Sequence, residues 1–580
     1  MEKWTKTDGK VLKEYTRPIV HLRRQFEAGR LVLVFGTGVA QQVGVPGWTE
    51  LNNKIASDSK VKGEKLLDRP LHESVDDFLE NESRETILKL LSGAGPEETI
   101  TTQRLFECYK KKKYACSNPA EYYSPKLDSS IYRQWRQIIR DKLYETTCLP
   151  KAILTKHKYL SSFLPIIRHM PLTITYNFDD ILEMALYHDP KKEDSRGYET
   201  VTNLRALPRR KSAVIYHPNG YIPRNPMEEK SQEMVLSESE FANRMADLTS
   251  GQYNSLLHVL SSNTCLFIGL SLKDSILKNL LKQSARIAPG NYHYYVDYYK
   301  TNSEKPTGPK ISSMESANFE AYNLKTLFLT NRELKSLGTL VYKGYDKAKR
   351  LLDDGPIFHF AQDNKIEHLV FCFYIIGSIG VGKSTCVSYL RSLITHDEWH
   401  EDKLPDLARH WKTLEDEESK RKEVDKWIAE QFKQKNQDLL DVKLGISICD
   451  RCPLDPISFT PKEKWHEKAK LLLNTISPNN RETIKPGHII YLWDDPEHLD
   501  IRVRRTPKEY DKDGLKELQN KLDKVYDMDG MTRIDCRFQS FYEIMKRICR
   551  IIHMENYQPA EIHERLIAIK EKRDSINAKK

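Results

Sequence analysis

The sequence predicts an α/β protein built on two parallel sheets, each covered by its own helices. Short apolar runs alternate with stretches long enough for helical crossovers, a pattern typical of parallel sheets. At 580 residues, the chain is too long for one hydrophobic core. The turn signal Asp353-Asp-Gly-Pro356 separates two such patterns. We therefore expect a first domain over 1–350, a linker over 351–364 and a second domain over 365–580.

The first domain contains several apolar runs that predict buried strands. These runs are Leu31–Phe35, Leu172–Tyr176, Ala213–Tyr216 and Cys265–Ile268. Residues from about 55 to 165 are rich in Lys, Glu and Leu, so a mostly helical insertion is expected there. From Tyr292 onward the pattern predicts one more strand, a polar loop near 301–316 and a closing helix. Together these features predict a Rossmann-like parallel sheet with a helical insertion.

The composition narrows the class of protein. The net charge of +10, from 92 basic and 82 acidic residues, is compatible with anionic nucleotides and makes nucleic acid an unlikely partner. No run reaches the roughly 18 apolar residues of a membrane span, and the N-terminus lacks a secretory signal. Of ten cysteines, only Cys449 and Cys452 form a CxxC pair, so a four-cysteine zinc ribbon is not expected. A cytoplasmic protein with reduced thiols follows.

The clearest motif lies in the second domain. Gly377 to Ser384 fits G-x-x-x-x-G-K-[ST] and follows the apolar run Leu369–Ile376. In such a loop the backbone N–H groups cradle phosphates, the lysine reaches the β/γ-phosphates and the hydroxyl binds Mg²⁺. We expect ATP or another nucleoside triphosphate with Mg²⁺, and Ser384 as the metal ligand. The expected contacts are Gly377, Gly380, Gly382, Lys383, Ser384 and Thr385.

Residues from about 370 to 560 also resemble the P-loop deoxynucleoside and nucleoside-monophosphate kinases. Asp450–Phe459 is similar to the family's Asp/Glu-Arg element, which holds substrate, and Ile501–Arg505 resembles its arginine-bearing lid. The family's general base is not matched by a complete element, although Asp397 and Glu398 lie near its place. The resemblance predicts a P-loop kinase-like α/β domain with further nucleotide contacts from Asp450, Arg451, Arg502, Arg504 and Arg505.

In the first domain, polar clusters follow each predicted strand. They are Phe35-Gly-Thr-Gly-Val39, Thr175–Glu183, Tyr216–Tyr221 and Phe267–Asp274. Ligands of open α/β sheets bind just beyond the carboxyl ends of the strands, so these clusters predict a binding site. Gly36 and Gly38 would permit a close approach of the backbone to a pyrophosphate.

The order of these clusters resembles the sirtuin-like family, specifically its bacterial anti-phage NAD hydrolases, over about 20–345. The resemblance implies that Asn177 orients the nicotinamide ribose or the attacking water and that Asp179 supports the loop. It also implies that NAD⁺ contacts Gly36, Thr37 and Gly38 at the pyrophosphate, and Gly269, Ser271 and Asp274 on the adenosine side.

One position departs from that family. Many relatives carry a histidine directly before the glycine that is Gly220 here, whereas this chain has Asn219. His217 stands two residues earlier, and an imidazole suits proton transfer at neutral pH. Either His217 is the catalytic acid/base group, or the site is altered.

These features lead to a main hypothesis and two alternatives. The main one is an NAD⁺ hydrolase that cleaves the nicotinamide–ribose bond in anti-phage defence, gated by the nucleotide-binding domain. The first alternative is an active deoxynucleoside or nucleotide kinase with an NAD- or ADP-ribose-sensing domain, and the second is a non-enzymatic sensor. The expected partners are a phage-derived signal or a protein encoded nearby. We also expect the chain to form a homo-oligomer.

Overall fold

The structure, a computed structural model, describes most of the chain. The described residues are 5–61, 97–119, 122, 124–157, 159–189, 197–202, 213–228, 235–237, 240, 252–272, 274–342, 370–399, 418–442, 444–478, 483–503 and 511–571. The predicted linker, part of the predicted insertion (62–96), and Arg504 and Arg505 lie outside them.

The chain divides into two compact units, and each is described by itself. The amino-terminal unit comprises Gln25–Ile287 and Tyr292–Tyr342. The carboxy-terminal unit comprises Met1–Arg24, Ala288–Asn291 and Lys343–Lys580. Two helices precede the first strand, α1 (Lys6–Glu14) and α2 (Thr16–Glu27). Among the described residues, no helix is both long and apolar enough to cross a membrane.

The amino-terminal unit is built on a seven-stranded parallel sheet in the order β3-β4-β2-β1-β5-β6-β7. Its strands are β1 (Leu31–Phe35), β2 (Leu172–Thr175), β3 (Tyr198–Val201), β4 (Ala213–Tyr216), β5 (Thr264–Ile268), β6 (His293–Tyr299) and β7 (Leu324–Thr330). The Rossmann-like parallel sheet expected from the sequence is therefore present. After Tyr292 the chain forms two strands rather than the single one predicted.

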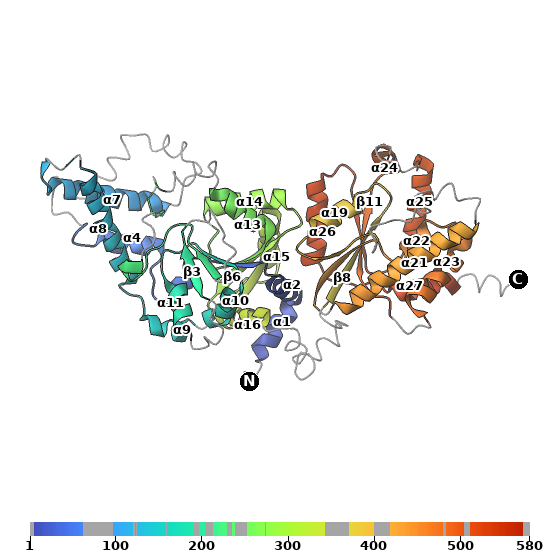
Figure 1. The fold of residues 1–580 in the computed structure, drawn as a ribbon, viewed down its shortest axis with the longest axis horizontal. Coiled ribbons are helices and arrows are strands. Elements are labelled where there is room, and N and C mark those ends of the chain that lie inside the picture. Colours follow the sequence, from blue (N-terminus) through green and yellow to red (C-terminus); the bar gives the residue numbers. More distant parts are fainter. Residues whose placement is uncertain are drawn as a thin grey trace. The chain divides into compact units, whose positions relative to one another are not determined.

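Helices surround this sheet (Figure 1). They are α3 (Thr37–Gln41), α4 (Trp48–Ala56), α7 (Glu97–Ala115), α8 (Pro125–Tyr144), η2 (Pro150–Ala152), α9 (Ile153–Lys156), α10 (Leu160–His169), α11 (Ile181–Tyr187), η3 (Pro226–Glu228), α13 (Gln252–Ser262), α14 (Ser275–Ile287), η5 (Asn302–Glu304), α15 (Pro309–Tyr322) and α16 (Asn331–Tyr342). The loop predicted near 301–316 is wrong from Pro309 onward, where α15 begins.

Burial of both faces of β1 explains why every residue of this strand is apolar. Val32 and Val34 belong to a hydrophobic cluster with residues of α13 and α14, such as Leu260 and Leu277. Figure 1 shows α10 and α16 on the opposite side of the sheet. Because successive side chains of a strand point to opposite faces, a strand covered on both faces must be apolar at every position.

The described residues between β1 and β2 are largely helical, and aromatic side chains join their helices. The Tyr109 ring of α7 lies 5.6 Å from the Trp135 ring of α8, and both are buried. Helix α8 begins at Pro125 with its cap from Ser124, whose hydroxyl accepts from the backbone of Lys126. A serine cap followed by proline is a common start for a helix.

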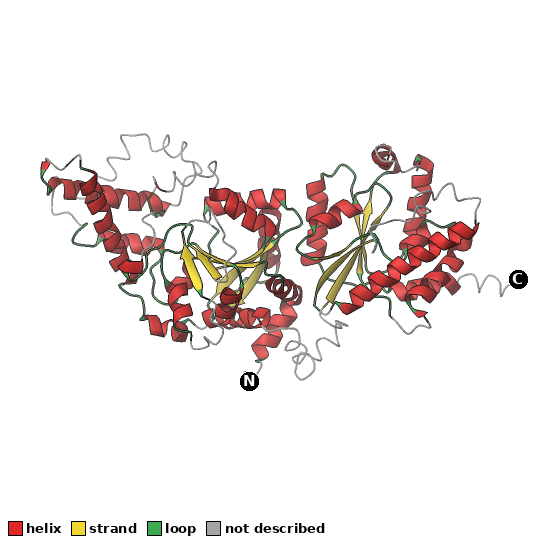
Figure 2. Cartoon of the chain, viewed as in Figure 1, coloured by secondary structure: helices red, strands yellow, loops and turns green. Residues whose placement is uncertain are grey.

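The carboxy-terminal unit contains a five-stranded parallel sheet in the order β12-β11-β8-β10-β9, with helices on both sides (Figure 2). Its strands are β8 (Val370–Gly377), β9 (Ile394–His396), β10 (Gly445–Asp450), β11 (His488–Trp493) and β12 (Met531–Asp535). Its helices are α19 (Lys383–Tyr389), α21 (Glu418–Asp441), α22 (Asp455–Ser458), η7 (Lys462–Lys464), α23 (Trp465–Ile476), α24 (Pro496–Val503), α25 (Lys512–Val525), α26 (Phe541–His553) and α27 (Ile562–Glu571).

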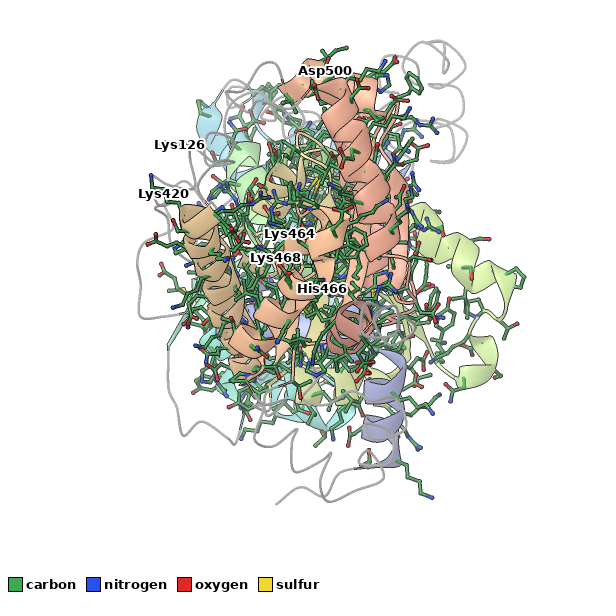
Figure 3. The ribbon with its side chains drawn as sticks, turned by 90° about the vertical axis from the view of Figure 1, so that its right-hand side faces the viewer. Lys126, Lys420, Lys464, His466, Lys468 and Asp500 are labelled. Atoms are coloured by element: carbon green, nitrogen blue, oxygen red, sulfur yellow. The ribbon has the colours of Figure 1, made fainter. Side chains whose placement is uncertain are left out.

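A partly buried ion pair joins α21 to α23. The ammonium of Lys468, labelled in Figure 3, lies 2.5 Å from Asp425 Oδ1. Val424 and Phe432, on the same helix as Asp425, are buried. These two apolar side chains of the charged helix α21 therefore serve packing within the unit.

Candidate functional site

The loops after β1 and β5 meet at the centre of the seven-stranded sheet. From β1 the chain continues to β2 on one side, and from β5 it continues to β6 on the other. Gly36 N donates to Ile268 O at 2.9 Å, and Gly38 N donates to Gly269 O at 3.0 Å. A change of connection direction between adjacent strands opens a crevice where ligands bind in such sheets. The structure thus brings Gly36, Gly38 and Gly269 together.

Asn177 connects the loop after β2 to this pair of loops. Its Nδ2 donates to Gly36 O at 3.2 Å, and its backbone N donates to Thr175 Oγ1 at 3.3 Å. The side chain is 5% exposed, and its Oδ1 has no hydrogen-bond partner in the part of the chain that the structure describes. A buried acceptor without a partner costs free energy unless a ligand or water supplies a donor.

His217, at the end of β4, has both ring nitrogens engaged. Nδ1 lies 2.8 Å from the Asn177 carbonyl oxygen, and Nε2 lies 2.9 Å from Glu183 Oε1. Burial by itself lowers the pKa of His217, but the Glu183 carboxylate and these hydrogen bonds outweigh it, so the pKa lies above its ordinary value. The acid/base role of His217 stays a prediction, and the geometry favours a positioning role.

Asp179 and Asp180 directly precede α11, and the carboxylate of each accepts a hydrogen bond from a backbone N–H group. Asp179 Oδ1 accepts from Ile181 N at 3.0 Å, and Asp180 Oδ2 accepts from Arg224 N at 2.7 Å. Burial raises the pKa of Asp179 to about 7, with the neighbouring Asp180 adding to the effect. Asp179 thus lies where a loop-supporting residue was expected.

Helix α8 of the insertion ties two of these loops together. The Tyr144 hydroxyl accepts from Asp180 N at 2.9 Å and donates to Ile222 O at 2.8 Å. Arg140 Nε donates to Pro223 O at 2.9 Å. The insertion therefore positions the polar loops after β2 and β4, which sequence patterns gave no means of predicting.

The remaining predicted NAD contacts differ in their surroundings. Thr37 and Ser271 are exposed at the ends of β1 and β5. Asp274 Oδ1 accepts from Ile276 N at 2.8 Å and Leu277 N at 3.2 Å, so this carboxylate caps α14. Asn219 Nδ2 donates to Tyr176 O at 3.3 Å.

In the carboxy-terminal unit, the glycine-rich loop follows β8 as expected. Gly377, Gly380 and Gly382 have φ of 149°, 80° and 99°, which favour glycine. A methyl group on Gly377 would lie 2.4 Å from the Leu492 carbonyl oxygen. Only glycine fits at the first position of this loop.

Lys383 is buried and folded onto its own loop. Its Nζ donates to the carbonyl oxygens of Gly377 and Ser378, both at 3.0 Å. Burial lowers the pKa of Lys383 to about 8, and the charge of Arg451 acts in the same direction. Ser384 and Thr385 are exposed. The Lys383 ammonium thus donates to loop carbonyls the hydrogen bonds that it would otherwise donate to a phosphate.

Beside this loop lies a charged cluster centred on Arg451. Arg451 Nε lies 2.7 Å from Glu398 Oε1, and its Nη1 lies 3.1 Å from Asp455 Oδ2. Arg451 has φ of 71°, which is strained for a side-chain-bearing residue. Lys435, which the sequence reading missed, donates from Nζ to the carbonyls of Asp450 (2.9 Å) and Glu398 (3.1 Å).

One lid arginine is described. Arg502 Nη2 lies 3.0 Å from Asp494 Oδ2, and Asp494 is fully buried. A methyl group on Gly380 would lie 3.9 Å from Arg502 Cβ, so α24 passes close to the glycine-rich loop. The contact of Arg502 with a phosphate stays a prediction, because its guanidinium is bound to Asp494.

Comparisons with known proteins give a family match within the amino-terminal unit. The family model described as SIR2-like domain matches residues 171–327, which includes β2 to β6 and begins after the β1 loop. A search of curated proteins found no match. Among solved structures, the chain is similar to that of deoxyadenosine kinase from M. mycoides with products dCMP and a flexible dCDP bound. The identity is 12% and the TM-score 0.24, over 31% of this chain and 96% of that chain.

Residues 171–327 of the amino-terminal unit are therefore similar to a SIR2-like domain. SIR2-like domains are NAD-dependent enzymes, so an NAD-related activity is indicated for this unit. The five-stranded parallel sheet with its glycine-rich loop is consistent with a P-loop-like fold.

Proposed function

We propose that the amino-terminal unit hydrolyses NAD⁺ at the bond between nicotinamide and ribose. The observation that carries the proposal is Asn177, whose Nδ2 is bound to Gly36 while its buried Oδ1 has no partner among the residues that the structure describes. This unused acceptor belongs to the SIR2-like region and adjoins the glycine loop of β1. A ribose hydroxyl or an attacking water would supply the missing donor.

The proposed reaction needs no acid to protonate the leaving group. Nicotinamide leaves as a neutral molecule from a cationic ring, so the protein must bind the dinucleotide, stabilise an oxocarbenium-like centre and present water. The backbone of Gly36, Thr37 and Gly38 would hold the pyrophosphate, and Asn177 Oδ1 would orient water or ribose. Gly269, Ser271 and Asp274 would line the adenosine side, Asp274 through the helix start that it caps.

The carboxy-terminal unit would bind ATP or a related triphosphate with Mg²⁺ and gate the hydrolase. Lys383 would leave the loop carbonyls for the phosphates, and the exposed Ser384 hydroxyl would ligate Mg²⁺. An unregulated NAD⁺ hydrolase is toxic, so a fused nucleotide switch is a plausible control. We place this activity in anti-phage defence in the bacterial cytoplasm, in a homo-oligomer that answers a phage-derived signal or a neighbouring-gene protein.

A second function, phosphoryl transfer to a nucleoside or nucleotide, is favoured by one contact. The Glu398 carboxylate lies on Arg451 beside the glycine-rich loop. A carboxylate held there could accept a proton from an acceptor hydroxyl, the role for which the sequence offered no complete element. In that case the amino-terminal unit would sense NAD or ADP-ribose.

Product analysis separates the two functions. The full chain is incubated with NAD⁺, with and without ATP, and separately with ATP and a panel of nucleosides and nucleotides. Asn177→Ala should abolish nicotinamide release and leave nucleotide binding intact, whereas Lys383→Ala should abolish binding of ATP. Phosphorylated acceptor without nicotinamide release, under every condition tested, would establish the kinase function instead.

A further inference from the structure

A buried pair of side chains behind Asn177 is assigned no part in the proposed reaction. His217 is 0% exposed, and the side chain of Glu183 is 3% exposed. His217 directly follows β4, and Glu183 lies on α11. The two residues are 34 positions apart along the chain and meet beside the loop that carries Asn177.

The hydrogen-bond pattern fixes where the ring hydrogens lie. The Asn177 carbonyl can only accept, so His217 Nδ1 carries a hydrogen and donates to it at 2.8 Å. Nε2 faces the Glu183 carboxyl at 2.9 Å, so one further proton is shared between ring and carboxyl. In either arrangement neither nitrogen is left over for a substrate.

The surroundings hold this pair in place. Thr200 Oγ1 donates to Glu183 Oε1 at 3.0 Å, and the Tyr221 ring packs against the imidazole with centroids 4.7 Å apart. The other charged groups near the ring are Asp179 and, beside that residue, Asp180. Turning the ring toward a ligand would break its hydrogen bonds to Glu183 of α11 and to the loop after β2 together.

The result is an asparagine held at several points. Its backbone N donates to Thr175, its carbonyl accepts from His217, and its Nδ2 donates to Gly36. Among the described residues, the Asn177 Oδ1 atom has no partner and remains available to a ligand. Resting on the proposed hydrolase function, we propose that His217, clamped by Glu183, is a positioning residue that fixes Asn177 and exchanges no proton with NAD⁺.

Three variants test this. Glu183→Gln keeps the shape of the pair, because the glutamine amide can donate to Nε2 while Nδ1 still donates to Asn177. We expect it to lower kcat/KM for NAD⁺ cleavage by less than about 10-fold, and Glu183→Ala to lower it by about 10- to 100-fold. His217→Gln should cost about 100-fold through loss of orientation. His258→Gln, on α13, is the matched histidine control.

The pH profile distinguishes positioning from proton transfer. We expect the same limbs of log kcat/KM against pH in wild type, Glu183→Gln and His217→Gln. If His217 were the base, loss of the Glu183 charge would move the ascending limb to lower pH, and His217→Gln would remove it. Either change would overturn the proposal.

A readout without turnover separates this proposal from the proposed function. In ¹⁵N-histidine-labelled full-length protein, the His217 signal is identified by its loss in His217→Gln. We expect it to keep its Nδ1–H from pH 6 to 8 and to stay unchanged on adding ADP-ribose. A ring whose nitrogen shifts respond directly to ADP-ribose would refute positioning. Absence of nicotinamide release from wild type would refute the hydrolase alone.

Discussion

Gly36 and Gly269 lie so close that a methyl group on Gly36 would be 2.6 Å from the Gly269 carbonyl oxygen. Backbone cannot withdraw from this contact without disturbing the pairing of β1 with β5, because the two strands are in register up to Phe35 and Ile268. The loop after β1 and the loop after β5 are thus held rigidly together.

Gly36→Ala should lower the free energy of unfolding of the amino-terminal unit by about 1–3 kcal/mol, since the added carbon overpacks a backbone contact. Urea unfolding followed by circular dichroism would measure the loss. Gly197→Ala is the matched control, because a methyl group there meets nothing within 4 Å. Equal stability of the two variants would contradict the close approach.

ATP binding should weaken as the pH rises through about 8. The pKa of Lys383 is about 8 without ligand, and a phosphate beside the ammonium would raise it. The affinity gained from this charge is therefore complete below pH 8 and lost above it. Calorimetric titrations from pH 6.5 to 9.5 would show the change. Lys383→Arg should remove the inflection because its guanidinium stays charged.

Asp179→Asn should stabilise the protein more at alkaline pH. The folded-state pKa of about 7 exceeds the ordinary 3.8, so the folded state holds a proton that the unfolded state has released. Stability is therefore lost as the pH rises from about 4 to about 7. We expect the gain from asparagine to be about 2 kcal/mol larger at pH 8 than at pH 5. The exposed Asp141→Asn should show no such difference in urea unfolding.

Arg451→Ala should destabilise the carboxy-terminal unit by about 3–5 kcal/mol, since it leaves the buried Asp455 without its cation. Thermal unfolding monitored by calorimetry would record it. Lys422→Ala removes an exposed pair with Glu418 on α21 and should leave the transition unchanged. A similar shift in both variants would argue against a structural role for the Arg451 cluster.

The sequence predicts the central strands well and the edges poorly. β1 and β4 lie where their apolar runs indicate, because strands covered on both faces consist almost entirely of apolar residues. Strands β3, β9 and β12 are edge strands with short or polar sequences, such as Tyr198-Glu-Thr-Val201, and are not predicted. Helix α19 ends at Tyr389, and β9 follows it from Ile394.

The site shows a similar division. Motifs that depend on local backbone geometry, such as Gly377 to Ser384, could be located from the sequence. Partners brought together from distant segments could not. Glu183 carries no signal of its pairing with His217, because it lies in an ordinary helical turn and Thr200 comes from an unpredicted strand. Lys435 is likewise one lysine among many on α21.

The central position of β1 has a consequence during synthesis. This strand leaves the ribosome early, yet its two hydrogen-bonded neighbours begin only at Leu172 and Thr264. A newly made, fully apolar strand must therefore wait without either neighbour while residues 36–171 emerge, and its edge toward β5 stays unpaired until Thr264 is made. Such a delay exposes it to wrong pairing with other nascent chains, and production of shortened chains ending before β5 should yield aggregates that chaperones retain.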